Sequence, residues 1–74
     1  MQINVKLVGA FRLDRFKEAV RNYQVGTSVR EVVDSLQLPD QILGIILING
    51  VHAEFEDILQ DGDSLTILPI LEGG

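Results

Sequence analysis

Two segments near the ends of the chain alternate between apolar and polar residues. Residues 2–8 and residues 64–70 both place apolar side chains at every second position. Because successive side chains of a strand point to opposite faces of a sheet, this period of two predicts two half-buried strands. Their apolar faces consist of Ile3, Val5 and Leu7 in the first segment and of Leu65 and Ile67 in the second.

A different period follows Ser28. Apolar residues recur there at i, i+3, i+4 and i+7, which predicts one apolar stripe along a helix. Ser28 and Glu31 have the spacing of a capping box at its start, and Pro39 prevents continuation, so we expect about ten helical residues. The stripe consists of Val29, Val32, Val33 and Leu36. A helix this short needs a sheet to cover its apolar side.

The middle of the chain contains hairpin signals. Residues 44–48 are apolar on both faces and lead into Asn49-Gly50, a pair that tolerates the positive φ angles of a type I′ turn. We therefore expect a buried strand and a short returning strand over residues 51–54. Asp61-Gly62-Asp63 predicts another turn, in which aspartate side chains bond to nearby backbone, just before the last strand.

Residues 9–25 are harder to interpret. Leu13, Phe16, Val20 and Tyr23 have helical spacing, whereas Ala19, Tyr23 and Val25, with the aliphatic part of Arg21, suit one face of a strand. We interpret residues 16–25 as a second strand. The resulting order of strand, strand, helix, strand, short strand and strand predicts an α+β fold, the β-grasp or ubiquitin-like fold. In it a mixed sheet of four to five strands covers one helix, and the first and last strands are parallel neighbours.

Length and composition limit what the chain can be. With 74 residues there is room for one domain, so we expect residues 1–74 to form a single β-grasp domain with a flexible C-terminal tail at residues 71–74. No cysteine is present, which excludes disulfides and thiolate chemistry, and His52 is the one histidine, so we expect no bound metal or cofactor. Lacking a long apolar segment or a signal peptide, the chain is expected to be cytoplasmic and not to bind membranes.

Charge is distributed unevenly along the sequence. The net charge is −5, yet all six basic residues lie within the first 30 positions, and residues 31–74 carry only acidic ones. Such a chain would repel phosphate backbones, so we expect no nucleic-acid binding. An acidic surface near the carboxyl end could steer the chain toward a basic partner, although a solvated surface is the commoner meaning of such charge.

No combination of side chains suggests catalysis, whereas the end of the sequence is unusual. The last strand runs into Leu71-Glu72-Gly73-Gly74. Glycines have no side chain, so this end could enter a narrow active site of another protein. A terminal Gly-Gly alone is weak evidence, because frayed ends are common.

Several short motifs together resemble the signature of the ThiS/MoaD family of ubiquitin-like sulfur-carrier proteins, the MoaD type slightly more than the ThiS type. They are Gly26-Thr27-Ser28-Val29, Asn49-Gly50, Leu59, Asp61-Gly62-Asp63, Pro69 and Gly73-Gly74. The resemblance covers nearly the whole chain, and the part least typical of the family is residues 9–25.

The resemblance implies a carrier protein and not an enzyme. An E1-like adenylyltransferase would use ATP and magnesium to adenylate the Gly74 carboxylate, with Gly73 as a spacer. A persulfide sulfur donor would then convert the adenylate to a C-terminal thiocarboxylate. The sulfur would pass to a sulfur-accepting synthase subunit in molybdopterin, thiamin or a related pathway, such as tungsten-cofactor or tRNA sulfuration.

We expect partners to bind the sheet face away from the helix. Alternation from Leu65 and Ile67 turns Leu68 and Ile70 outward, and we predict that Ile46 or Ile48 joins them on the neighbouring strand. Two other functions stay open. The chain could be a ubiquitin-like protein modifier conjugated to lysines through Gly74, or a non-catalytic β-grasp interaction module in which the Gly-Gly end is incidental.

Overall fold

A computed structural model describes residues 1–70 of the chain; residues 71–74, the predicted tail, lie outside the described residues. Its centre is a five-stranded mixed sheet with the strand order β2-β1-β5-β3-β4. The strands are β1 (Gln2–Leu7), β2 (Glu18–Asn22), β3 (Leu43–Ile48), β4 (Val51–His52) and β5 (Ser64–Pro69). One α-helix, α1 (Val29–Ser35), and two 3₁₀ turns, η1 (Gly9–Arg12) and η2 (Asp40–Ile42), complete the fold.

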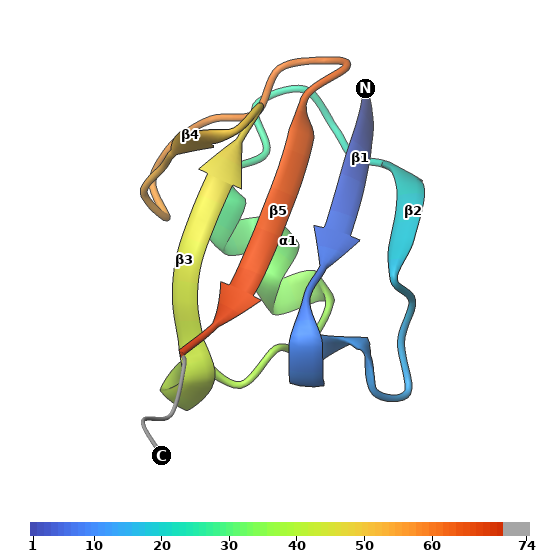
Figure 1. Cartoon of the computed structure of the whole chain (residues 1–74). Coiled ribbons are helices and arrows are strands. Elements are labelled where there is room, and N and C mark those ends of the chain that lie inside the picture. Colours follow the sequence, from blue (N-terminus) through green and yellow to red (C-terminus); the bar gives the residue numbers. More distant parts are fainter. Residues whose placement is uncertain (71–74) are drawn as a thin grey trace.

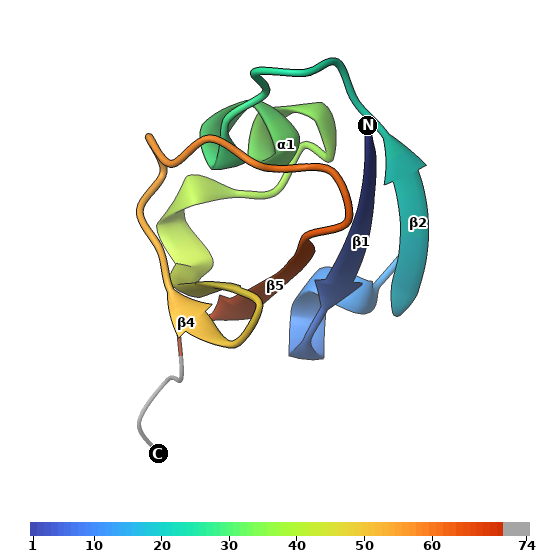
Figure 2. The same cartoon turned by 90° about the horizontal axis from the view of Figure 1, so that it is seen from above.

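The helix covers one face of the sheet. Figure 1 looks onto the sheet with α1 behind it, and Figure 2 shows α1 enclosed on one side by the curved strands. β1 and β5 are parallel neighbours, while the pairs β1–β2, β3–β5 and β3–β4 are antiparallel. This is the predicted α+β β-grasp arrangement, with the first and last strands side by side.

The core lies between the sheet and α1. All five apolar residues predicted on the inner faces of β1 and β5 are buried, as are Val29, Val32 and Val33 of the helix stripe. Leu36 is only partly buried and packs against the edge of this core. Phe11 of η1 and Leu59 are also buried, although no periodic pattern in the sequence predicts this. Burial of each large apolar side chain contributes about 1.5–3 kcal/mol, so this layer holds α1 on the sheet.

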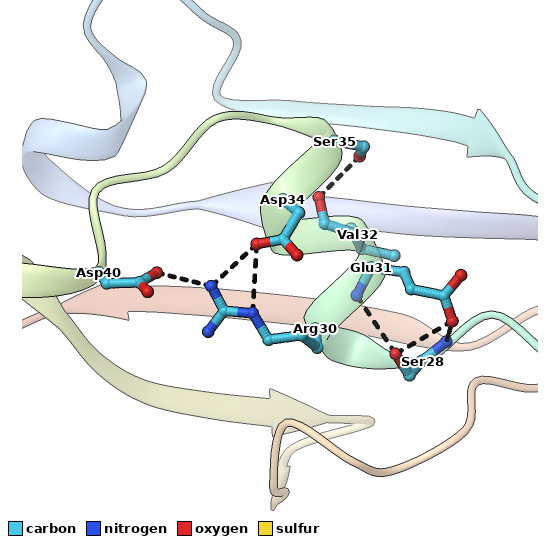
Figure 3. Close-up of polar contacts among 7 residues, drawn as sticks. All are labelled: Ser28, Arg30, Glu31, Val32, Asp34, Ser35 and Asp40. Carbon is cyan, nitrogen blue, oxygen red and sulfur yellow. Dashed lines mark hydrogen bonds and ion pairs between the residues drawn. The ribbon is translucent and has the colours of Figure 1, made fainter.

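The helix begins at the predicted capping box. The Ser28 hydroxyl accepts a hydrogen bond of 3.2 Å from the Glu31 backbone nitrogen, and the Glu31 carboxylate accepts one of 3.2 Å from the Ser28 nitrogen (Figure 3). Two backbone N–H groups that the first turn leaves unpaired are thereby satisfied.

The helix ends earlier than predicted. It has seven residues, because Gln37 takes a left-handed conformation with φ of +55° before Pro39 is reached. The guanidinium of Arg15 donates hydrogen bonds to the carbonyl oxygens of Leu36 (3.2 Å) and Gln37 (3.0 Å). A cation at the carbonyl end of a helix is favourable, so a residue from the loop before β2 closes the last turn.

The ambiguous segment contains the predicted second strand, but a shorter one. β2 covers residues 18–22 and pairs antiparallel with β1, with Ala19 and Arg21 less exposed than their neighbours. The inclusion of Val25 in this strand was wrong: it is 89% exposed and lies in the turn before α1. Residue 25 lies in a turn beyond the end of the strand, so the alternation of side chains between the two faces does not extend to it.

The hairpin between β3 and β4 forms at the predicted pair. Asn49 and Gly50 have φ angles of +53° and +81°, as a type I′ turn requires, and Ile48 pairs with Val51. The Asn49 side chain also donates to an Asp63 carboxylate oxygen (2.9 Å) and accepts from the Ser64 backbone nitrogen (2.9 Å). The hairpin is thereby fastened to the start of β5.

Candidate functional site

The end of β5 is the part of the described structure closest in sequence to the predicted reactive residues. β5 lies between β1 and β3 and ends at Pro69. The backbone nitrogen of Ile70 donates a hydrogen bond of 2.8 Å to the carbonyl oxygen of Ile42 in η2. The fold therefore holds the chain up to Ile70, four residues before Gly74. Gly73 and Gly74 lie outside the described residues, and their roles stay predictions.

The outward direction of Leu68 and Ile70 agrees with the predicted alternation. Leu65 and Ile67 are fully buried against the helix, whereas Leu68 is partly exposed and Ile70 is 50% exposed. These two side chains therefore belong to the face away from α1.

The placement of Ile46 and Ile48 on that outer face is wrong. Ile46 pairs with Ile67 and Ile48 pairs with Leu65, and residues directly opposite each other in an antiparallel ladder share a face. Ile46 is accordingly 4% exposed, and Ile48 is partly buried against the core. Both side chains point toward the helix and cannot form a partner-binding surface with Leu68.

The residues next to Ile46 in β3 take the outer positions. Ile45 pairs with Leu68 and Leu47 pairs with Thr66, so both lie on the face away from α1, and Ile45 is 49% exposed. The sequence offered no signal for this choice, because β3 is apolar on both faces and the hairpin fixes its register against β4 only. We call Ile45, Leu47, Leu68 and Ile70 the outer apolar patch.

The acidic turn before β5 has a structural role. An Asp61 carboxylate oxygen accepts from the Gln2 backbone nitrogen (2.7 Å), and one from Asp63 accepts from the Gln60 nitrogen (2.8 Å). These bonds agree with the predicted turn. Six strand residues separate this turn from Ile70, a distance of about 20 Å, so the two carboxylates are near the carboxyl end in sequence but not in space.

A charged cluster connects α1 to η2. The Arg30 guanidinium lies 2.8 Å from the Asp34 carboxylate and 2.7 Å from that of Asp40, as Figure 3 shows, and its carbon is 5.1 Å from the Phe55 ring centre. Hydrogen bonds to Asp34 and then Asp40 raise the pKa of Arg30 above its usual value. Exposed ion pairs stabilise weakly. The Asp40 contact nevertheless links α1 to η2, whose Ile42 carbonyl accepts the Ile70 hydrogen bond.

Residues 1–70 show neither a pocket nor a group of side chains that could hold a metal ion. None of the helices described is long and apolar enough to cross a bilayer. His52 is exposed, with its Nδ1 atom 3.8 Å from a Glu54 carboxylate oxygen.

The sheet order, the single covering helix and the parallel central strands define a small ubiquitin-like domain. The family model for the Mut7-C ubiquitin domain matches residues 10–73, and the chain belongs to this family. No curated protein matches the sequence significantly.

Solved structures show the same fold. SAMP1 from Haloferax volcanii, the small archaeal modifier protein 1, superposes with a TM-score of 0.80 at 19% identity, with both chains fully covered. A putative molybdopterin converting factor subunit 1 from Pyrococcus furiosus gives 0.78 at 21% identity, covering 96% of this chain and 99% of the other. A chain from the complex of subunits 1 and 2 of the Helicobacter pylori molybdopterin-converting factor gives 0.69 at 20% identity, with full coverage of both. The family match confirms the ubiquitin-like class of protein that the sequence resembled, and these neighbours agree with the ThiS/MoaD resemblance in fold.

Proposed function

We propose that this chain is a sulfur carrier that works through the carboxylate of Gly74. The observation that carries the proposal is the end of β5: the fold holds the chain up to Ile70, an exposed member of the outer apolar patch, and a Gly-Gly sequence follows within four residues. A partner that binds the patch would have the carboxyl end within reach. The similarity to subunit 1 of molybdopterin-converting factors supports the same function.

The proposed chemistry has three steps. A Gly74 carboxylate oxygen attacks the α-phosphorus of ATP in an E1-like adenylyltransferase, with magnesium bound there, and pyrophosphate leaves. The terminal sulfur of a persulfide donor then attacks the acyl carbon, AMP leaves with the C–O bonding pair, and an acyl disulfide forms. A second thiol attacks the donor's own sulfur in this S–S bond, so the donor and the thiol are joined as a disulfide and the thiocarboxylate leaves with the S–S bonding pair. A carboxylate is a poor electrophile until it carries such a leaving group, and the product is a nucleophilic thiocarboxylate.

The proposal gives the carrier at least two protein partners. One is the E1-like enzyme, and the other is a synthase subunit that accepts the sulfur in molybdopterin, thiamin or a related pathway. The Helicobacter pylori complex of subunits 1 and 2 supports a partner of the second kind. Both partners need the carboxyl end, so they would bind the carrier in turn.

Intact-mass spectrometry tests this function. The purified protein must first show a free carboxylate at Gly74. Incubation with an E1-like adenylyltransferase of the source organism, ATP, magnesium and a persulfide donor should then replace one oxygen by sulfur. A variant that lacks Gly74 should melt at the same temperature and show no exchange. If the full-length protein also shows none, the sulfur-carrier function is refuted.

A second candidate function is conjugation to lysines through Gly74, and the similarity to the small archaeal modifier protein favours it. The sequence determines which protease can reveal such a conjugate. Arg30 is the last basic residue, so trypsin would leave a long branch on a modified lysine. A protease that cleaves after glutamate would cut after Glu72 and leave Gly73-Gly74 on the lysine, a remnant that peptide mass spectrometry identifies. Its absence from cells that contain the thiocarboxylate would favour the carrier alone.

A further inference from the structure

Pro69, the last residue of β5, lies between glycines of the two neighbouring chain segments. On one side is Gly9, the first residue of η1 and two positions after β1, where an added Cβ would lie 3.3 Å from the Pro69 ring. On the other side is Gly44 of β3, where an added Cβ would lie 2.8 Å from the Pro69 carbonyl carbon and oxygen. The end of β5 therefore lies in close contact with a glycine on each side.

Gly44 is needed for a steric reason and not for its φ angle. Its added Cβ would also lie 2.9 Å from the Ile70 nitrogen, so the three atoms nearest to it all belong to the backbone of Pro69 and Ile70. Side chains can rotate away from a new methyl group, whereas this backbone is tied by the Ile70 hydrogen bond to Ile42. Any side chain at position 44 must therefore displace the end of β5.

The same glycine lies at an irregularity of the sheet. The register between β3 and β5 shifts between Leu43 and Ile45, which makes Gly44 the extra residue of a β-bulge. Bulges bend a strand and change the direction of the side chains that follow. Here the bulge lies beside the end of β5, directly before the C-terminal residues.

We propose that Gly44 and Pro69 are positioning residues: their close backbone packing sets the direction in which the chain leaves the sheet and so aligns the Gly74 carboxylate in the active site of the adenylating partner. This inference rests on the proposed function. Four residues extend at most about 14 Å, so the direction set at Ile70 acts close to the reacting carboxylate. Misplacement by about 1 Å at a reacting centre can lower a rate about a hundredfold.

Gly44→Ala tests the proposal, with Gly62→Ala as its control. Gly62 has a φ of +87° and open space around its added Cβ, and it lies before the other end of β5, so alanine there strains the fold without touching Pro69. The assay is ATP–pyrophosphate exchange by an E1-like adenylyltransferase of the source organism, with calorimetry for the dissociation constant of the complex. For Gly44→Ala we expect kcat to fall at least tenfold while Kd stays within twofold, and for Gly62→Ala we expect neither to change.

The outcomes separate this inference from the function on which it rests. If the unmodified chain supports no exchange, the proposed adenylation fails. If it does and Gly44→Ala has the same kcat while folded, the positioning role is refuted. A rise in Kd alone would likewise refute it, because it would assign Gly44 to docking.

A second variant covers the case in which Gly44→Ala does not fold. Pro69→Ala removes the ring that packs against Gly9 and introduces no new contact, so the fold should persist. It should lower kcat by a smaller factor than Gly44→Ala, at unchanged Kd, and exchange of the Ile70 amide hydrogen with solvent should become faster. Unchanged kcat and amide exchange in folded Pro69→Ala would overturn the proposal.

Discussion

Ile46 of β3 lies directly opposite Ile67 of β5, and the two side chains share the face of the sheet that packs against the helix. This single pairing determines which residues of β3 and β5 are buried and which are exposed. The adjacent pair, Ile45 and Leu68, has to lie on the other face, where Ile45 is half exposed. A shift of the register by one residue would exchange the buried and exposed sets completely.

The first prediction compares two neighbouring substitutions in β3. Ile46→Glu should unfold the domain, because it places an unpaired carboxylate in the core. At about 0.05–0.15 kcal/mol per residue, 74 residues give a total stability of roughly 4–11 kcal/mol, and such a charge costs several of these. Ile45→Glu adds the same charge to the outer face and should melt within a few degrees of the unmodified protein. Circular dichroism distinguishes them, and equal melting temperatures would show that the register is wrong.

The elements that the sequence predicted well are those with a local signal. Alternation in β1 and β5, the stripe of α1 and the Asn49-Gly50 turn each depend on neighbouring residues, and all four form in the structure. The ends of elements were less predictable. α1 stops when Gln37 turns left-handed and Arg15 closes its last turn, and the Arg15 contact comes from a distant loop.

The candidate site was predictable only in part, for the same reason. Leu68 and Ile70 follow from alternation within one strand. The outer residues of β3 depend on pairing with a strand about 20 positions later, and an apolar sequence on both faces carries no information about it. The close approach of Gly44 to Pro69 is likewise non-local, and a glycine at the start of a strand does not reveal it.

The second prediction concerns Asn49, which combines a left-handed backbone with side-chain hydrogen bonds to Asp63 and to Ser64 at the start of β5. Asn49→Gly keeps the backbone conformation and loses the bonds, which should cost about 1–2 kcal/mol. Asn49→Ala loses the bonds and adds the strain of a Cβ at positive φ, so it should cost about 1 kcal/mol more. Urea unfolding measures both values. Equal losses would mean that the turn does not depend on the φ angle of this residue.

The last prediction tests the outer apolar patch. Ile45→Glu and Leu68→Glu should each raise the dissociation constant for the E1-like partner at least tenfold, or about 1.4 kcal/mol, because a carboxylate would be buried against an apolar contact. Asn22→Glu is the matched control, since it adds the same charge to the same sheet face on β2, with β1 between it and β5. Calorimetry should give that variant the affinity of the unmodified protein. If all three bind equally well and remain folded, the partner does not use this patch and must recognise another face or the carboxyl end alone.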